Sequence, residues 1–232
     1  MTDVEIHAGG DHPDDRLRLV EPAWFPWLDH HRYAFSLGVR RGPEVWLSGQ
    51  TASAFDPAEG TVTSGGDMTH QATVAWDKVL AVLSGAGLGP SHVTRVVEYV
   101  TAEGLARYPL AVGVREARLG GYQPAVATVP VEHLVRPDAW LEVEVSAHDQ
   151  PDAFALVHLP TLTGQGATLA EQLESIFRKA AELLEPYGLG LSDVVKTVDY
   201  TTPATRREYR ASGAVRRAYL GPDFPTATGV LV

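Results

Sequence analysis

The chain contains no cysteine, only two methionines among its 232 residues, and no long hydrophobic run. Without thiols it can form no disulfide bond, no thiolate metal site and no cysteine nucleophile. Its apolar runs are much shorter than the ~20 residues that cross a bilayer. The first residues also lack the basic and apolar regions of a signal peptide. We therefore expect a cytoplasmic protein that has no membrane partner.

Basic residues are also scarce. The 19 lysines and arginines are outnumbered by 29 aspartates and glutamates, which gives a net charge of −10 and a pI near 5.3. A general nucleic-acid-binding protein needs a basic surface, so we expect no nucleic-acid partner. The hydrophobic fraction of 44% is ordinary for a globular protein, and the length suits two domains of about 100 to 130 residues.

One pattern occurs twice in the chain, at a constant offset of 101 residues. The offset holds without a gap from about residue 71 to residue 129. A period of this length is too long for a solenoid repeat and matches the size of a small domain. The sequence therefore predicts one structural unit that occurs twice. The identical pairs include Gln71 with Gln172, Lys78 with Lys179, Gly87-Leu88-Gly89 with Gly188-Leu189-Gly190, Tyr99 with Tyr200, Arg115 with Arg216, and Pro124 with Pro225.

The first copy, residues 33–149, predicts the element order β-β-α-β-α-β-β. Alternating apolar residues favour strands, and apolar residues three or four apart favour helices. Asp67 or Thr69 can cap the start of the first helix. We expect a hairpin at 33–50 with its turn at Arg41-Gly42-Pro43, helices at 68–85 and 108–119, and strands at 93–100, 125–131 and 140–145.

Residues 1–32 are predicted to form an N-terminal arm, whose first 20 residues are polar and acidic and are expected to be loosely ordered. Trp24, Phe25 and Trp27 lie beside two prolines, which bar a regular helix. We expect this segment to be extended and to pack on the domain or on a neighbouring subunit, since three exposed aromatic rings would be costly. A ligand-stacking role is the alternative.

The second copy, residues 152–232, is predicted to be partial, with residues 149–152 as the linker. Residues 154–163 stand where the first copy has a full hairpin, and no counterpart of the strand at 140–145 follows. We expect a helix at 169–185, a strand at 193–201, a helix at 205–219 and a strand from Thr226.

Three strings of the first copy resemble the Rid (YjgF/L-PSP) family: Val45-Trp46-Leu47-Ser48-Gly49-Gln50, Gly87-Leu88-Gly89 followed by Val93 and Val96-Val97, and the run from Arg136 to Glu144. The resemblance covers residues 33–148 and, in part, 154–232. It implies an α+β fold of two tandem chorismate-mutase-like domains, each a mixed β-sheet with two helices packed on one face. It also implies a homo-oligomeric, trimer-like ring, with ligand pockets in the clefts between neighbouring domains.

The best-known branch of this family hydrolyses reactive enamines and imines to ammonia and a 2-keto acid. There an arginine in a Pro-Ala-Arg string binds the substrate carboxylate, and a glutamate on the final strand positions the attacking water. In this chain Glu142 stands at the glutamate position, whereas Val126 stands where the arginine is expected. Ala227 takes the arginine position in the second copy. The resemblance therefore favours a substrate that lacks this carboxylate.

Glu142 is the candidate catalytic residue. Alternation places it on the same strand face as Glu144, so the alternative is that both are solubilising surface charges. The candidate substrate-binding residues are Phe35, near the cleft entrance, Gly49, where backbone would approach a ligand, Val126, Thr128, and Arg136, which could supply a displaced guanidinium or be an ordinary loop arginine.

We expect no metal ion and no cofactor. His30 and His31 are neighbours in the sequence, but adjacent histidines on an extended segment point to opposite faces. No third ligand stands at a spacing typical of metal sites. No phosphate-binding loop or dinucleotide fingerprint occurs in the sequence.

Three functions follow. The first is a diverged Rid-type hydrolase or deaminase of a small imine, enamine or related metabolite, with Glu142 as general base in an apolar pocket that includes Phe35 and Val126. The second is a non-catalytic protein that binds a small molecule on the same ring scaffold, which the loss of the arginine in both copies favours. The third and least favoured is an endoribonuclease, which the net charge of −10 opposes.

Overall fold

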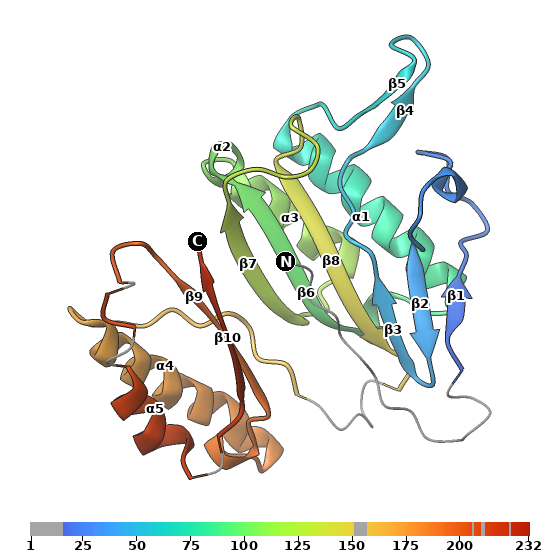
Figure 1. Cartoon of the computed structure of the whole chain (residues 1–232). Coiled ribbons are helices and arrows are strands. Elements are labelled where there is room, and N and C mark those ends of the chain that lie inside the picture. Colours follow the sequence, from blue (N-terminus) through green and yellow to red (C-terminus); the bar gives the residue numbers. More distant parts are fainter. Residues whose placement is uncertain (1–15, 151–156, 206, 210–211, 223) are drawn as a thin grey trace. The chain divides into compact units, whose positions relative to one another are not determined.

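The computed structural model describes residues 16–150, 157–205, 207–209, 212–222 and 224–232 (Figure 1). Residues 1–15 of the expected arm and residues 151 and 152 of the expected linker therefore lie outside the described residues. The chain divides into two compact units, one that extends to His158 and one from Leu159 to Val232. Among the described residues, no helix has the length and apolar character needed to cross a membrane.

A six-stranded sheet, in the order β1-β2-β3-β8-β6-β7, forms the centre of the first unit. Neighbouring strands are antiparallel except β6 and β7, which are parallel. The predicted order of strands and helices is confirmed here, and the fold is α+β with a mixed sheet. The strands are β1 (Arg18–Val20), β2 (Gly38–Arg41), β3 (Glu44–Leu47), β6 (Val93–Thr101), β7 (Ala125–Val131) and β8 (Leu141–His148).

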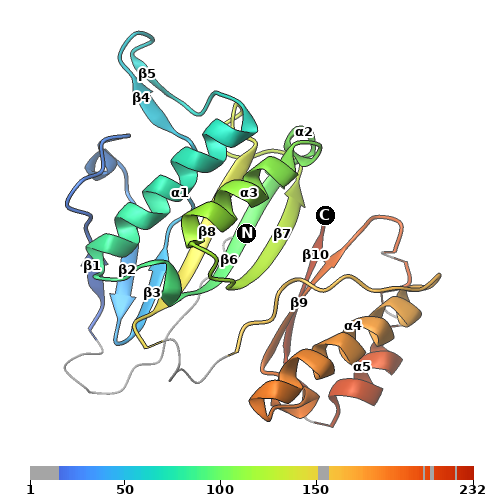
Figure 2. The ribbon, with the colours of Figure 1, turned by 180° about the vertical axis from the view of Figure 1, so that it is seen from behind.

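Helices α1 (Met68–Gly85) and α3 (Tyr108–Leu119) lie side by side on one face of this sheet (Figure 2). The Asp67 carboxylate caps α1 by accepting a hydrogen bond from the backbone N–H of His70 at 2.8 Å. The stripe of α1 that faces the core has the predicted helical spacing, and it includes Ala72, Trp76, Val79 and Leu83, all fully buried. Short helical segments occur at η2 (His30–Arg32), η3 (Pro90–His92) and α2 (Ala102–Leu105).

The first hairpin is present but begins later than predicted. Its turn contains Gly42, whose φ of 56° suits glycine, and β2 begins only at Gly38. Tyr33 and Phe35, which were expected in the strand, precede it and are 42% and 49% exposed. Their rings pack against each other, with centroids 5.8 Å apart. The apolar alternation of this segment therefore does not mark a strand with one buried face.

The end of the N-terminal arm is more ordered than predicted. Residues 18–20 form β1, which pairs with β2 and buries Val20. Phe25 packs on the domain as expected, since it lies against the core, whereas Trp24 is 67% exposed in the single chain. A separate small hairpin, β4 (Ala54–Asp56) and β5 (Thr61–Thr63), interrupts the loop between β3 and α1.

A carboxylate lies in the core between the sheet and α3. Glu98 of β6 is fully buried. It forms an ion pair with Arg115 and accepts a hydrogen bond from the Tyr108 hydroxyl. The Tyr108 hydroxyl also lies 2.8 Å from the hydroxyl of Thr128 on β7. Burial raises the pKa of Glu98, and the positive charge of Arg115 opposes that rise. These polar contacts join α3 to β6 and β7.

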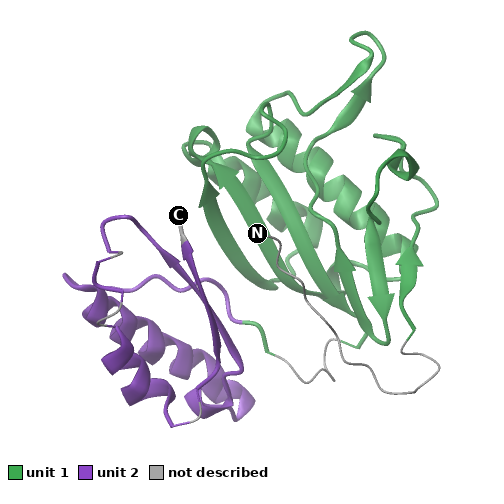
Figure 3. Ribbon diagram, in the orientation of Figure 1, with its two compact units in different colours: residues 1–158 green, residues 159–232 purple. Residues whose placement is uncertain are grey.

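The second unit (Figure 3) is smaller and has its own apolar core. Its two main helices, α4 and α5, pack on each other, and β9 pairs with β10 in parallel. Residues 157–163, the described part of the expected segment 154–163, form no strand. The elements are α4 (Leu169–Leu184), η4 (Glu185–Tyr187), η5 (Leu191–Asp193), β9 (Lys196–Thr201), α5 (Gly213–Leu220) and β10 (Thr226–Leu231).

The pairing of β9 with β10 has the same register as the pairing of β6 with β7. Lys196 lies opposite Thr226, and Arg95 lies opposite Ala125. Both members of the first pair follow those of the second by 101 residues. The offset found in the sequence therefore also relates two parallel strand pairs in the structure.

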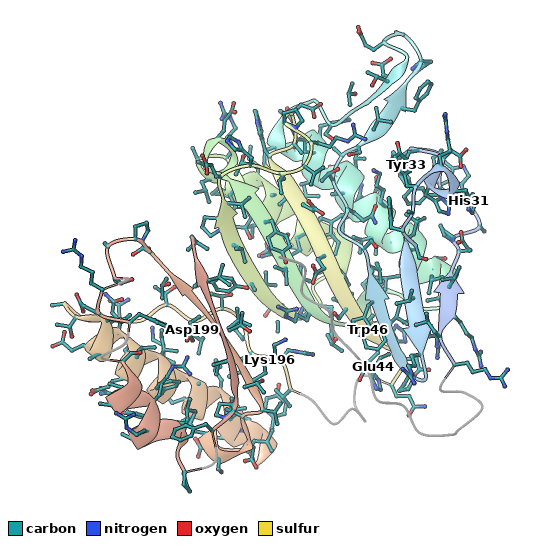
Figure 4. The ribbon with its side chains drawn as sticks, viewed as in Figure 1. His31, Tyr33, Glu44, Trp46, Lys196 and Asp199 are labelled. Carbon is teal, nitrogen blue, oxygen red and sulfur yellow. The ribbon has the colours of Figure 1, made fainter. Side chains whose placement is uncertain are left out.

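A second acidic residue stands at this offset from the buried carboxylate of the first unit. Asp199 of β9 (Figure 4) accepts a hydrogen bond from the Tyr209 hydroxyl at 2.8 Å and forms an ion pair with Arg216. Each of these three residues follows its counterpart in the Glu98 contacts by 101 residues. The polar contacts that join helix and strand are thus alike in the two units.

The bounds of two elements in the second unit differ from the prediction. Helix α5 begins at Gly213 instead of residue 205, and the described residues between them form turns. There the Thr205 hydroxyl donates to the Thr202 carbonyl oxygen at 3.1 Å, a local bond that competes with a helix. Strand β9 begins at Lys196, later than the predicted residue 193, which is instead the last residue of η5.

Removing the cation that pairs with Glu98 should destabilise the first unit strongly. We expect Arg115→Met to lower the free energy of unfolding by about 3–5 kcal/mol, because it leaves a buried carboxylate without its charged partner. Arg118→Met is the matched control on the same helix, since Arg118 pairs with Asp77 at the surface, and it should cost about 0–1 kcal/mol. Urea denaturation measures both values, and equal losses would contradict the assignment of Glu98 and Arg115 as a core pair.

Candidate functional site

The two faces of β8 differ in chemistry. Leu141, Val143 and Val145 are buried in the core beneath α1 and α3, whereas Glu142 and Glu144 alternate with them and are half-buried. Successive side chains of a strand point to opposite faces, so both glutamates lie on the face of the sheet opposite the two helices. This placement makes Glu142 available for chemistry outside the core.

Gly49 lies against the carboxyl group of Glu142. The residue after it, Gln50, exchanges two backbone hydrogen bonds with Val143, at 2.8 and 2.9 Å, which holds this part of the chain beside β8. A Cβ added to Gly49 would overlap Oε1 of Glu142 and lie 2.9 Å from its Cδ. Gly49 was expected to allow close approach of a ligand, and within this chain the group that approaches it is the Glu142 side chain.

The carboxyl group of Glu142 is poorly solvated and has few partners. Burial raises its pKa, and the negative charge of Glu144 raises it further. In the described part of the chain, Glu142 accepts no hydrogen bond and forms no ion pair. Glu144 instead accepts a hydrogen bond from the Tyr99 hydroxyl at 3.4 Å and lies 3.9 Å from Arg95. Glu142 is therefore the acid of this pair that is able to bind a water molecule or a proton.

Val126 and Thr128 lie on the other face of the sheet. Val126 packs against the hydrophobic core, and the Thr128 hydroxyl contacts Tyr108 of α3. The structure of one chain therefore does not bring these two candidates together with Glu142. Val126 and Thr128 are two residues apart, so the sequence shows that they lie on the same face of β7. Whether Glu142 lies on that face depends on the register of β7, β6 and β8.

Phe35 lies outside the sheet, in the segment that precedes β2. A hollow of about 390 Å³ lies in the same region, and neither Phe35 nor Glu142 lines it. Because the hollow is remote in sequence from β8 and contains none of the candidate site residues, we do not assign the candidate chemistry to it. Its lining residues are Phe25, Pro26, Leu28, Asp29, Arg32, Tyr33, Phe55 and Val62.

Arg136 lies in the loop between β7 and β8 and donates a hydrogen bond to the Val62 carbonyl oxygen at 3.4 Å. Its positive charge also influences the pKa of Lys78, a residue of α1 whose side chain is fully buried. Burial and, to a smaller extent, the charge of Arg136 lower the pKa of Lys78 to about 7. The Lys78 ammonium group donates to the carbonyl oxygens of Thr51, at 3.0 Å, and Ser53. This geometry gives Lys78 a structural role in holding the loop after β3.

Sequence reasoning did not assign a role to Lys78, although its recurrence as Lys179 was a signal. Lys179 likewise donates to a loop carbonyl oxygen, that of Thr163, at 2.8 Å. The sequence also showed no sign of a third possible metal ligand near His30 and His31. Within the described residues, Glu21 lies close to these two histidines, which are the first two residues of η2.

Comparison with known proteins identifies the first unit. A family model described as Endoribonuclease L-PSP matches residues 30–149, just over half of the chain. No curated protein matches the chain.

Several solved structures are similar to the same part. A member of the YjgF/YER057c/UK114 family from Mycobacterium tuberculosis is 25% identical and covers 57% of this chain and 99% of its own, with a TM-score of 0.45. A protein of unknown function from Pseudomonas aeruginosa is 28% identical and covers 57% of this chain and 92% of its own, with a TM-score of 0.47. TdcF from E. coli, solved with bound serine, is 23% identical and covers 56% and 98%, with a TM-score of 0.46.

The family model spans the hairpin, both helices and the last three strands of the large sheet. It includes the strand that carries Glu142 and the loop that carries Gly49. On this match, the chain belongs to the endoribonuclease L-PSP family, the Rid or YjgF family that the sequence resembles.

Proposed function

We propose that this protein hydrolyses a small imine, enamine or related metabolite, with Glu142 as general base. The observation that carries the proposal is the state of the Glu142 carboxyl group. It is half-buried, has a raised pKa and accepts no hydrogen bond from any described residue. A general base works best when its pKa lies near the working pH, and burial with a neighbouring acid moves a glutamate in that direction.

The proposed reaction needs only water and the carboxyl group. Ionised Glu142 accepts a proton from a bound water as the water oxygen attacks the imine carbon. Return of this proton to the nitrogen gives the neutral carbinolamine. Glu142 then takes the proton of the carbinolamine hydroxyl and passes it to the nitrogen as the carbon–nitrogen bond breaks, so that ammonia and a carbonyl compound leave. The carboxylate is regenerated, so the protein supplies no net proton or electron.

The proposed substrate lacks the carboxylate that the family's arginine would bind. Val126, which stands at the arginine position, packs in the core, and Ala227 stands there in the second unit. Arg95, which shares the face of Glu142, already lies beside Glu144. A neutral or weakly polar imine fits these surroundings better than an anionic one.

We propose further that the second unit is a partial copy of the first and that chains assemble as a homo-oligomeric ring. The shared register of the parallel strand pairs and the shared acid–tyrosine–arginine contacts support a common origin of the two units. The ring rests on the family resemblance. In this assembly each first unit contributes one candidate acid, and the second units act as its structural partners.

A second candidate function is non-catalytic binding of a small molecule at the same place. The absence of an arginine at Val126 and Ala227 favours it. Thermal-shift screening against keto acids, imine precursors and aromatic metabolites separates the two: a ligand that stabilises the protein but is never turned over would support binding alone. An endoribonuclease is the third candidate, and RNA cleavage that Glu142→Gln abolishes would support it against the net charge of −10.

Loss of the proposed base should remove activity without unfolding the protein. We expect Glu142→Gln to lower kcat/KM for imine hydrolysis by about 10²–10⁴-fold, because the amide cannot accept the proton. Ammonia release from carboxylate-free imines, generated in place from primary amines by an amine oxidase, measures this loss. Glu132→Gln, at a side chain that is 92% exposed, is the matched control and should keep full activity. Unchanged turnover in Glu142→Gln would disprove the proposed role.

The pH dependence should report the raised pKa of Glu142. The base acts when ionised, so kcat/KM should rise with pH to a plateau, with its midpoint above the usual glutamate value of about 4.3. Glu144→Gln removes the repulsion between the two acids and should move this midpoint to lower pH. Titration of carbon-13-labelled glutamate side chains gives the same shift without a substrate. A midpoint that moves upward, or does not move, would contradict the coupling.

A further inference from the structure

Three side chains that can bind a metal ion gather at the end of the N-terminal arm. Glu21 follows β1, and His30 and His31 open η2; each offers one ligand atom, and these atoms lie within 4.8 Å of one another. Nε2 of His30 is 2.9 Å from a carboxylate oxygen of Glu21. The two imidazole rings have centroids 4.0 Å apart and are tilted by 39°.

This arrangement corrects the reasoning that spoke against a metal site in the sequence. The sequence predicts an extended segment here, in which adjacent histidines point to opposite faces. Instead, residues 30–32 form a 3₁₀ turn, closed by a hydrogen bond from the Tyr33 N–H to the His30 carbonyl oxygen at 3.0 Å. The turn brings both rings to one side. The third ligand, Glu21, comes from nine residues upstream, too far for a local motif to reveal.

Glu21 and His30 are each held in place by their surroundings. Val20, next to Glu21, is buried and paired in β1, and the chain at Glu21 passes so close to Gly85 that a Cβ there would lie 2.8 Å from the Glu21 carbonyl oxygen. His30 is 8% exposed, and the ring of Phe25 packs edge-on against it at 5.6 Å. His31 and Glu21 are exposed, so solvent and metal ions can reach the group from their side.

We propose that Glu21, His30 and His31 bind one divalent transition-metal ion, with Zn²⁺ as the expected occupant. Two imidazoles and one carboxylate are a common protein donor set for zinc, and the fourth position is then left to water or another ligand. Tetrahedral zinc with bonds of about 2.0–2.1 Å needs ligand atoms about 3.3 Å apart, which small side-chain rotations from the present positions can supply. The ion would replace the hydrogen bond between His30 and Glu21 and would link β1 to η2. This site does not depend on the proposed activity of Glu142.

Zinc titration of the full-length protein tests the proposal. The protein is freed of any histidine tag, treated with EDTA and dialysed, and Zn²⁺ is then titrated in competition with a coloured chelator. We expect one Zn²⁺ bound per chain. His31→Ala and Glu21→Gln should each weaken binding by at least about tenfold, since even an indirect partner of a metal ligand is worth about 10–100-fold. His133→Ala is the control, because His133 is 82% exposed and lies 3.7 Å from Glu132, and the described residues supply no third ligand beside them.

The visible absorption of bound Co²⁺ provides a second measurement, because it depends on the ligands and should be lost in His31→Ala. His31 is exposed, so the metal-free variant is expected to melt at the temperature of the metal-free parent; this comparison excludes misfolding as the cause of lost binding. Stoichiometric Zn²⁺ that both ligand variants retain would overturn the proposal. So would a parent protein that binds Zn²⁺ no better than His31→Ala, which would leave Glu21 and His30 as a simple hydrogen-bonded pair.

Discussion

The alternation of side chains along β8 is the constraint on which both the core and the candidate site depend. Leu141, Val143 and Val145 fill the space beneath the helices, and Glu142 and Glu144 take the positions between them. A shift of this strand by one residue would place two carboxylates in the core and expose the apolar side chains. Because β8 lies between β3 and β6, the same register also aligns the rest of the large sheet. The stability of the core thus keeps the acids on the face where they can act.

Three ionisable groups of the first unit, Glu98, Lys78 and Glu142, differ in whether a partner compensates their charge. Glu98 and Lys78 are fully buried, and each has partners that compensate its charge: an arginine and a tyrosine for the first, two carbonyl oxygens for the second. Such groups tie one element to another. Glu142 is less buried but has no compensating partner among the described residues, and its pKa is raised. A half-buried acid with a raised pKa and no partner among the described residues is a candidate for chemistry rather than for holding the fold together.

Local periodicity predicted much of the fold, and long-range contacts account for what it missed. The helix at 68–85 and the hairpin around Gly42 follow from spacing and turn residues, and Glu142 was singled out from its string. Strand β1 was missed because three residues show no period, and only their pairing with β2 makes them a strand. The approach of Glu21 to His30 was missed for the same reason. Val126 was grouped with Glu142 although they occupy opposite faces of the sheet. The sequence of one strand does not show which of its residues share a face with those of another strand, because this depends on the register between them.

Gly49 has a consequence for how this site can diverge. A Cβ at position 49 would overlap Oε1 of Glu142, so any side chain there would require the carboxyl group to move. The fold would tolerate such a change far better than a change at the core pair. If Glu142 acts as proposed, a single methyl group at this position would displace the proposed base while leaving the core residues unchanged. Relatives with this fold are best compared first at the glycine, and only then at the glutamate, when asking which of them retain the chemistry.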